Sequence, residues 1–161
     1  GRSVVADGRL LLEIDQPNTL QYATLQEPLL TDFDLTVEAR LLEGDLDSSY
    51  GVLFRVQSQQ FYRFDITGNG MYMIERRNSD GTWSRLLDDW TAHGAINQGF
   101  TVTNQLQVIT SGQSLRFLVN GILVQEVRDS AQIAGHIALD AGTFGQGGLR
   151  VAFDNLLIRE P

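Results

Sequence analysis

The sequence predicts an all-β fold, in which two antiparallel sheets pack as a jelly-roll sandwich with little or no helix. Three observations support this prediction. Apolar and polar residues alternate in many short runs, turn residues separate these runs, and helical periodicity is almost absent. Alternation with a period of two is typical of strands buried on one face, and short strands that recur about every 10 to 12 residues are typical of a sandwich.

The alternation is clearest in residues 34–42, where Leu35, Val37, Ala39 and Leu41 share one face. Similar runs follow along the chain, and they predict strands at 34–42, 50–56, 60–67, 71–76, 82–87, 104–110, 114–119, 122–127, 133–140 and 149–158.

Three segments between these runs have distinct characters. Asn120-Gly121 joins two alternating runs and predicts a tight hairpin, because a type I′ turn needs two residues with positive φ. Residues 129–134 form a turn that is the only helix candidate. Residues 88–101 have no strand pattern, and a long loop inside a small domain is more often functional than idle.

Composition restricts the classes of function. The 161 residues are expected to form one domain, excised from a longer protein. The net charge of −8 excludes nucleic acid as a partner, because phosphate binding needs a basic surface. The chain has no cysteine for a disulfide or thiolate metal site, and no apolar run approaches the roughly 20 residues of a membrane span.

Several segments, in order, resemble a known superfamily: S-Y-G-V-L-F-R (49–55), Y-R-F-D-I (62–66), N-Q-L-Q-V-I-T-S-G (104–112), L-R-F-L-V-N-G (115–121), G-H-I-A-L-D-A-G (135–142) and V-A-F-D-N-L-L-I (151–158). Together they resemble the concanavalin A-like lectin/glucanase superfamily, close to bacterial domains related to family 16 glycoside hydrolases and to 3-keto-disaccharide hydrolases. The resemblance covers residues 30–158. It implies a jelly-roll sandwich with one concave sheet, and an extracytoplasmic or cell-surface setting.

The catalytic motif that this resemblance would imply is incomplete. Family 16 enzymes carry E-x-D-x-x-E on one strand, so that the carboxylates share a face and flank the scissile bond. This chain has Glu13-Ile14-Asp15, but Asn18 and Thr19 stand where the second Glu would fall. We therefore expect a non-catalytic recognition or adhesion module within a larger bacterial protein. A glycoside hydrolase-like enzyme acting on a glycan or modified disaccharide, and a purely structural spacer, are the alternatives.

A glycan-binding site is expected on the face of the middle strands opposite Val52, Phe54, Tyr62 and Phe64. Alternation assigns Arg55, Arg63 and Asp65 to that face, together with Phe61, Met73 and Glu75, while Trp83 follows on the next strand and Trp90 in the long loop. The predicted ligand-binding residues are Arg55, Arg63, Asp65, Trp83 and Trp90. In the alternative interpretation, the charged residues pair across strands as an exposed salt-bridge ladder.

The resemblance also implies one structural calcium ion. The last strand of the family carries an Asp that helps to hold this ion with backbone carbonyls of an early glycine loop, and Asp154 and Gly44 take these positions. One carboxylate suffices because calcium accepts carbonyl and water oxygens as well. In the alternative interpretation, Asp154 accepts backbone N–H groups at a bulge and Asn155 supports the kink.

Overall fold

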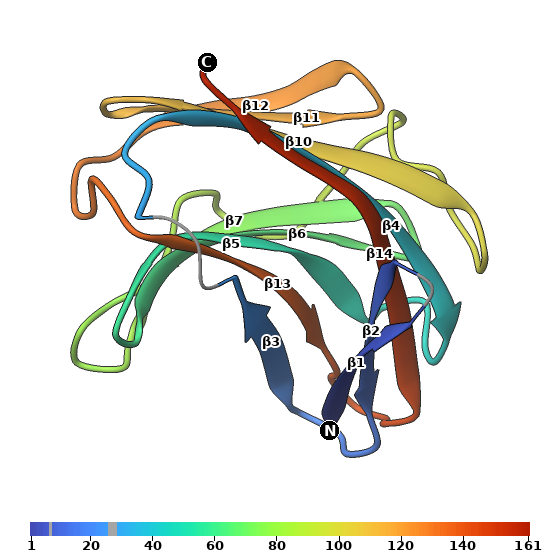
Figure 1. Cartoon of the computed structure of the whole chain (residues 1–161). Coiled ribbons are helices and arrows are strands. Elements are labelled where there is room, and N and C mark those ends of the chain that lie inside the picture. The colour runs from blue at the N-terminus through green and yellow to red at the C-terminus, as the bar shows by residue number, and fades with distance from the viewer. Residues whose placement is uncertain (7, 26–28) are drawn as a thin grey trace.

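The computed structural model describes residues 1–6, 8–25 and 29–161, and it confirms the predicted all-β sandwich (Figure 1). The described residues contain no helix, and therefore no helix long and apolar enough to span a membrane. The strands are β1 (Arg2–Ala6), β2 (Arg9–Ile14), β3 (Leu20–Thr24), β4 (Phe33–Glu43), β5 (Ser49–Gln57), β6 (Gln60–Thr67), β7 (Met71–Arg77), β8 (Trp83–Arg85), β9 (Thr91–Ala92), β10 (Thr103–Ser111), β11 (Ser114–Val119), β12 (Ile122–Arg128), β13 (His136–Gly142) and β14 (Leu149–Arg159).

Two antiparallel sheets contain these strands. Sheet A has the order β1-β2-β14-β4-β10-β11-β12, and sheet B has the order β3-β13-β5-β6-β7-β8, with β9 paired to β7. In Figure 1, β10, β11 and β12 of sheet A lie above β5, β6 and β7 of sheet B. The chain passes between the sheets several times, so the two layers are joined along the whole sequence.

The hydrophobic core lies between the sheets. Along β4, residues Phe33 to Leu41 alternate strictly between buried and half-buried, as expected for a strand with one face in the core. Aromatic rings fill the middle of the sandwich: Phe54 stacks on Tyr62 with ring centroids 5.2 Å apart, and Phe117 of sheet A contacts Phe64 at 4.9 Å. These contacts hold β5 and β6 against β11.

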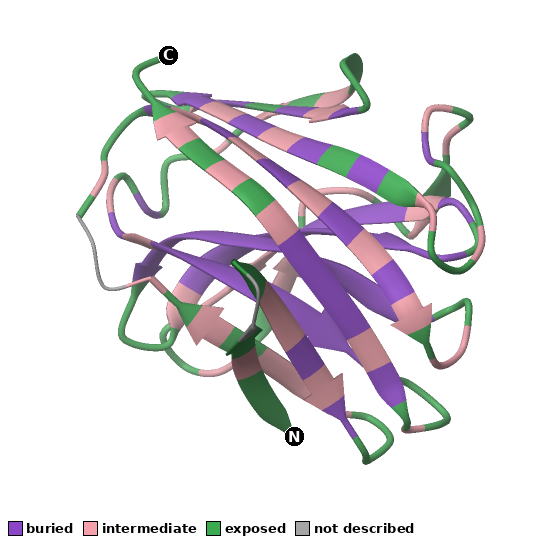
Figure 2. Cartoon of the chain, turned by 45° about the vertical axis from the view of Figure 1, so that its right-hand side comes forward, coloured by how far each residue is buried: buried purple, intermediate pink, exposed green. Residues whose placement is uncertain are grey.

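Sheet B differs from sheet A in being buried on both faces at its centre. Figure 2 shows alternating classes along the sheet A strands and continuous burial along β5 and β6. Leu53, Val56, Phe61 and Ala138 form a second apolar cluster outside the main core. The outer face of sheet B therefore carries side chains that shield one another from water, which an ordinary solvated face does not do.

Most of the predicted strands are confirmed, and the departures are local. Asn120 and Gly121 have φ of 53° and 81°, as the predicted hairpin requires. Residues 129–134 form no helix, since the polar side chain of Asp129 instead accepts the N–H of Ala131 and bonds to two other segments. Strands β1, β2, β3 and the two-residue β9 were not predicted.

Candidate functional site

Arg63 lies at the centre of the outer face of sheet B and contacts acidic residues from three strands. Its Nη2 donates to Asp65 at 2.8 Å on the same strand, Nη1 donates to Glu75 of β7 at 2.9 Å, and Nε donates to Asp140 of β13 at 3.3 Å. Nη2 also donates to the hydroxyl of Ser49 at 2.6 Å. Four of the five N–H groups of the guanidinium are thus engaged, and one hydrogen of Nη1 is left for a ligand.

Asp65 and Asp140 form a buried acid pair beside this guanidinium. Both residues are 0% exposed, and one carboxylate oxygen of each has no other hydrogen-bond partner among the described residues. Burial raises the pKa of Asp140 well above its ordinary value, and the negative charge of Asp65 raises it further, against the opposing effect of Arg63. Asp140 therefore gives up its proton at a higher pH than a solvated aspartate does, because its pKa is raised.

A glycine between the two strands makes this pair possible. Gly51 of β5 is in register with Asp140 on one side and Asp65 on the other. A Cβ at this position would lie 2.7 Å from Oδ1 of Asp65 and 2.0 Å from the carbonyl oxygen of Phe64. The absence of a side chain at Gly51 thus leaves the space in which the two carboxyl groups meet.

Aromatic residues line one end of the face. The ring centroids of Tyr22 and Phe61 are 5.7 Å apart, and those of Phe61 and Trp83 are 5.6 Å apart. The guanidinium carbon of Arg77 lies 5.1 Å from the Trp83 ring centroid, and that of Arg63 lies 5.8 Å from it. Trp83 is 37% exposed and Tyr22 39% exposed, so both offer ring surface to a ligand.

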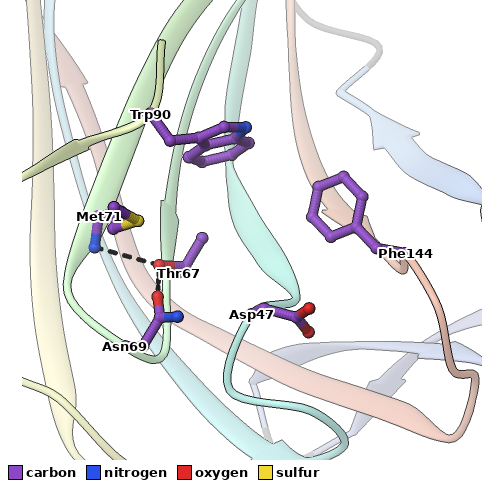
Figure 3. A pocket seen from close by; sticks show the side chains of 6 residues that line it. All are labelled: Asp47, Thr67, Asn69, Met71, Trp90 and Phe144. Carbon is purple, nitrogen blue, oxygen red and sulfur yellow. Dashed lines mark hydrogen bonds between the residues drawn. The ribbon is translucent and has the colours of Figure 1, made fainter.

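The opposite end is formed by two loops. Trp90, from the loop before β9, and Phe144, from the loop after β13, approach at right angles with ring centroids 6.1 Å apart. Together with Asp47, Thr67, Asn69 and Met71 they line a hollow of about 260 Å³ (Figure 3).

Three adjoining hollows form one groove across the face. The hollow at Trp90 and the central one, about 260 Å³ with Arg63 in its wall, share Phe144. The central hollow and the one at Trp83, about 340 Å³, share Leu20. The outer-face groove thus has aromatic rings at both ends and a guanidinium between them, which suits a ligand with apolar faces and hydroxyl groups.

Three of the five predicted binding residues line this groove: Arg63, Trp83 and Trp90. The ion pairs of the ladder interpretation also form, but the Arg63 side chain is only 9% exposed, so they are buried rather than solvated. Asp65 lies beneath the groove as a partner of Arg63 rather than in contact with solvent.

Arg55 does not share the outer face, contrary to the expectation from alternation. A bulge between Phe54 and Gln57, with φ of 51° at Arg55, turns its side chain toward the other sheet. There its guanidinium is 0% exposed and donates to the carbonyls of Thr31, Gly112 and Gln132 and to the carboxylate of Asp32. Arg55 therefore ties the two sheets together at one end of the sandwich.

The predicted calcium ligands are also separated. Asp154 pairs with Glu38 across β14 and β4, whereas Gly44 follows the far end of β4. Residues 38 and 44 are six positions apart, which is about 20 Å along a strand. Asp154 instead accepts the N–H of Asn155 at 2.8 Å within a bulge, and the Asn155 side chain bonds to Glu38. The distance along β4 therefore argues against one ion held by both Asp154 and Gly44.

Sequence reasoning missed the groove residues Asp47, Asn69, Tyr22 and Phe144, and it missed the buried Asp140 that contacts Arg63. The alternation of His136, Ala138, Asp140 and Gly142 could have placed Asp140 on the outer face. Phe144 is a lone aromatic residue in a glycine-rich loop, and nothing in the local pattern indicates that it meets Trp90.

A comparison with known protein families shows which family the chain belongs to. Residues 1–159 match the family described as the 3-keto-alpha-glucoside-1,2-lyase-like domain. The chain belongs to this family. The match covers nearly the whole chain, including the first three strands that the resemblance noted in the sequence had left out. A comparison with curated protein sequences finds no match.

Solved structures with the same fold include proteins of different kinds. The carbohydrate-binding module CBM66 from Bacillus subtilis has a TM-score of 0.80 at 12% identity, and the alignment covers 99% of this chain and 92% of that chain. A native glycosidic hydrolase has a TM-score of 0.65 at 11% identity, covering 99% and 82%. Sheep galectin-11 in complex with glycerol has a TM-score of 0.59 at 16% identity, covering 89% and 98%. At these identities the likeness shows the fold alone.

Proposed function

We propose that this domain is a non-catalytic glycan-recognition module of a larger bacterial protein, and that its ligand lies in the outer-face groove of sheet B. The observation that carries the proposal is the groove itself, in which exposed aromatic rings at both ends flank the free Nη1 hydrogen of Arg63. Sugar rings have apolar C–H faces that pack on aromatic side chains, and hydroxyl groups that accept from planar donors.

The buried acids have a positioning role in this proposal. Asp65, Glu75 and Asp140 hold the guanidinium of Arg63 on three sides, so its free N–H has one fixed direction. A donor fixed in this way loses little side-chain entropy when it binds a hydroxyl group. The fold shared with a protein named as a carbohydrate-binding module supports the same function.

The test is binding of defined oligosaccharides, with aromatic substitutions at both ends of the groove. A glycan array identifies the ligand, and calorimetry then compares the wild type with Trp83→Ala and Trp90→Ala. We expect each substitution to weaken binding about tenfold, in line with the loss of an aromatic platform. Phe100→Ala is the matched control, because Phe100 is 42% exposed but lines none of the three hollows.

Absence of binding to every glycan tested would favour the spacer alternative. Equal losses for Trp83→Ala, Trp90→Ala and Phe100→Ala would show that the ligand lies elsewhere on the surface.

A second candidate function is catalysis on a 3-keto disaccharide, and the acid pair favours it. The family description names a 1,2-lyase, and elimination next to a keto group needs a base for the proton and an acid for the leaving group. Asp65 and Asp140 are two carboxyl groups on either side of Gly51, and burial raises the pKa of Asp140. Both are 0% exposed, and a reacting group must touch its substrate, so recognition is the better supported function. Incubation with a 3-keto disaccharide distinguishes the recognition module from the enzyme. A recognition module releases no product, whereas an enzyme releases product and loses this activity in the Asp140→Asn variant.

A further inference from the structure

The hollow at the Trp90 end of the groove has the composition of a cation-binding corner. The ring planes of Trp90 and Phe144 meet at 89°, and Figure 3 shows the two rings on adjacent sides of the space. Met71 adds a thioether to the wall. Aromatic faces attract ammonium groups through the negative charge of the ring surface, and perpendicular rings present this surface from two directions.

A carboxylate completes the corner. Asp47 belongs to the turn between β4 and β5, is exposed, and lines the hollow below the two rings (Figure 3). The other acids of this face are engaged by Arg63, whereas none of the ion pairs among the described residues involves Asp47. Asp47 therefore offers a full negative charge to a ligand.

The polar wall of the hollow is held in place by its own hydrogen bonds. The N–H of Met71 donates to the hydroxyl oxygen of Thr67 at 3.1 Å, and that hydroxyl donates to the side-chain oxygen of Asn69 (Figure 3). With its oxygen engaged, Asn69 presents donors to the hollow, which suit a sugar hydroxyl beside a charged group.

We infer that this corner binds an ammonium group, and that the glycan of the groove contains a protonated amino sugar at this position. The inference rests on the proposed function, because Phe144 borders both this corner and the central hollow that holds Arg63. The charge around the corner favours a cationic sugar over an anionic one such as a uronic acid. Asp47 adds a carboxylate to the three acids around Arg63, and those acids already outnumber that guanidinium.

The test compares two oligosaccharides of equal length, one of glucosamine and one of N-acetylglucosamine, at a pH where the amino groups are protonated. Calorimetry with the whole chain should show binding of the glucosamine oligomer at least about tenfold tighter, and a preference that weakens with added salt. Asp47→Asn should abolish the preference. Asp88→Asn, which removes the same charge from an exposed position outside the hollow, should leave it intact.

Each outcome decides the inference. Equal affinity for the two oligomers, or a preference that survives Asp47→Asn, overturns the ammonium site while glycan binding by the groove stands. If neither oligomer binds, tetramethylammonium chloride tests the corner without a sugar. A shift of the Trp90 indole resonance in the wild type but not in Asp47→Asn then supports a site for alkylated ammonium ligands, and no shift overturns the site.

Discussion

At the scale of single residues, the outer face of sheet B depends on Arg63. Its guanidinium is the only cation in direct contact with Asp65, Glu75 and Asp140 among the described residues. Two buried carboxyl groups and the half-buried Glu75 around one guanidinium cannot all be ionised without a large cost in desolvation and repulsion. Protonation of Asp140, whose pKa is raised, lowers that cost and links the stability of the fold to pH.

Asp140→Asn tests this link. Because burial and Asp65 raise the pKa of Asp140, the native state keeps a proton that the unfolded chain releases near its ordinary value of about 4. The native state binds more protons in that range, so the free energy of unfolding should fall as the pH rises from about 4 toward the raised pKa. The amide imitates the protonated acid and does not titrate, so this fall should disappear. Urea unfolding of both proteins at several pH values measures it.

Asp129→Asn is the control, because its effect has the opposite sign. Burial raises the pKa of Asp129, but hydrogen bonds from Tyr62, Ala131 and Arg76 outweigh burial and the net shift is downward. Stability contributed by Asp129 is therefore present above about pH 4 and lost on acidification. If the Asp140→Asn protein keeps the wild-type loss of stability with rising pH, the raised pKa of Asp140 is not its cause.

Gly51→Ala tests the packing that brings the acid pair together. The added methyl group would lie 2.0 Å from the carbonyl oxygen of Phe64, and backbone atoms cannot move away as a flexible side chain can. We expect a loss of at least about 1 to 3 kcal/mol in the free energy of unfolding, measured in urea. Gly94→Ala is the matched control and should be close to neutral, since nothing lies within 4 Å of its added Cβ. Similar effects of the two substitutions would contradict this account.

At the scale of elements, two β-bulges limit how well alternation in the sequence predicts which face of a sheet a side chain occupies. Alternation correctly placed Arg63 and Asp65 on the outer face, because β6 is regular. The same rule failed for Arg55, because a bulge shifts the period by one residue and sends the side chain to the inner side. The bulge is stabilised by acceptors distant in sequence, such as Thr31 and Gly112, and no local pattern shows them.

The bulge in β14 explains why its strand carries Asp154 and Asn155. Asn155 has φ of 53°, a conformation that Asn and Gly adopt more readily than other residues. Asn155→Gly should therefore lose only the bond to Glu38, whereas Asn155→Val should cost about 1 to 2 kcal/mol more in the free energy of unfolding. Thermal or urea unfolding measures the difference, and equal stability of the two variants would show that the backbone at this position is not strained.

The same bulge leads to a prediction about calcium. Asp154 engages its own backbone, and Gly44 is about 20 Å away along β4. We expect the melting temperature to be the same in excess calcium and in excess EDTA. A ligand that binds only the native state raises the melting temperature. A higher melting temperature in calcium would therefore support the metal site implied by the resemblance. Asp154→Ala, if it removed that difference, would identify the ligand.

At the scale of the whole molecule, the first three strands connect the two sheets at their edges. Strands β1 and β2 extend sheet A, and β3 extends sheet B beside β13. The sequence did not predict these three strands. Strands β1 and β3 are five-residue edge strands with few buried side chains and weak alternation, and the Leu10-Leu11-Leu12 run of β2 does not alternate. The groove was predicted only in part, because some of its residues contact each other only in the folded protein. Trp90 and Phe144 lie in loops 54 positions apart in the sequence, and the folded sheet brings them together.

Truncation from the N-terminus tests how much the sandwich depends on these strands. A chain that begins at residue 30 lacks Leu12 and Ile14, which are 0% exposed, and it leaves the edges of β13 and β14 unpaired. Unpaired edges and lost core surface favour aggregation, so this chain should show no cooperative unfolding transition. A chain that begins at residue 9 loses only β1, whose Val5 is 77% exposed, and it should unfold cooperatively. Circular dichroism during heating compares the two. A cooperative transition in the shorter chain would mean that residues 30–161 contain a complete folding unit, and that β2 and β3 are not needed for folding.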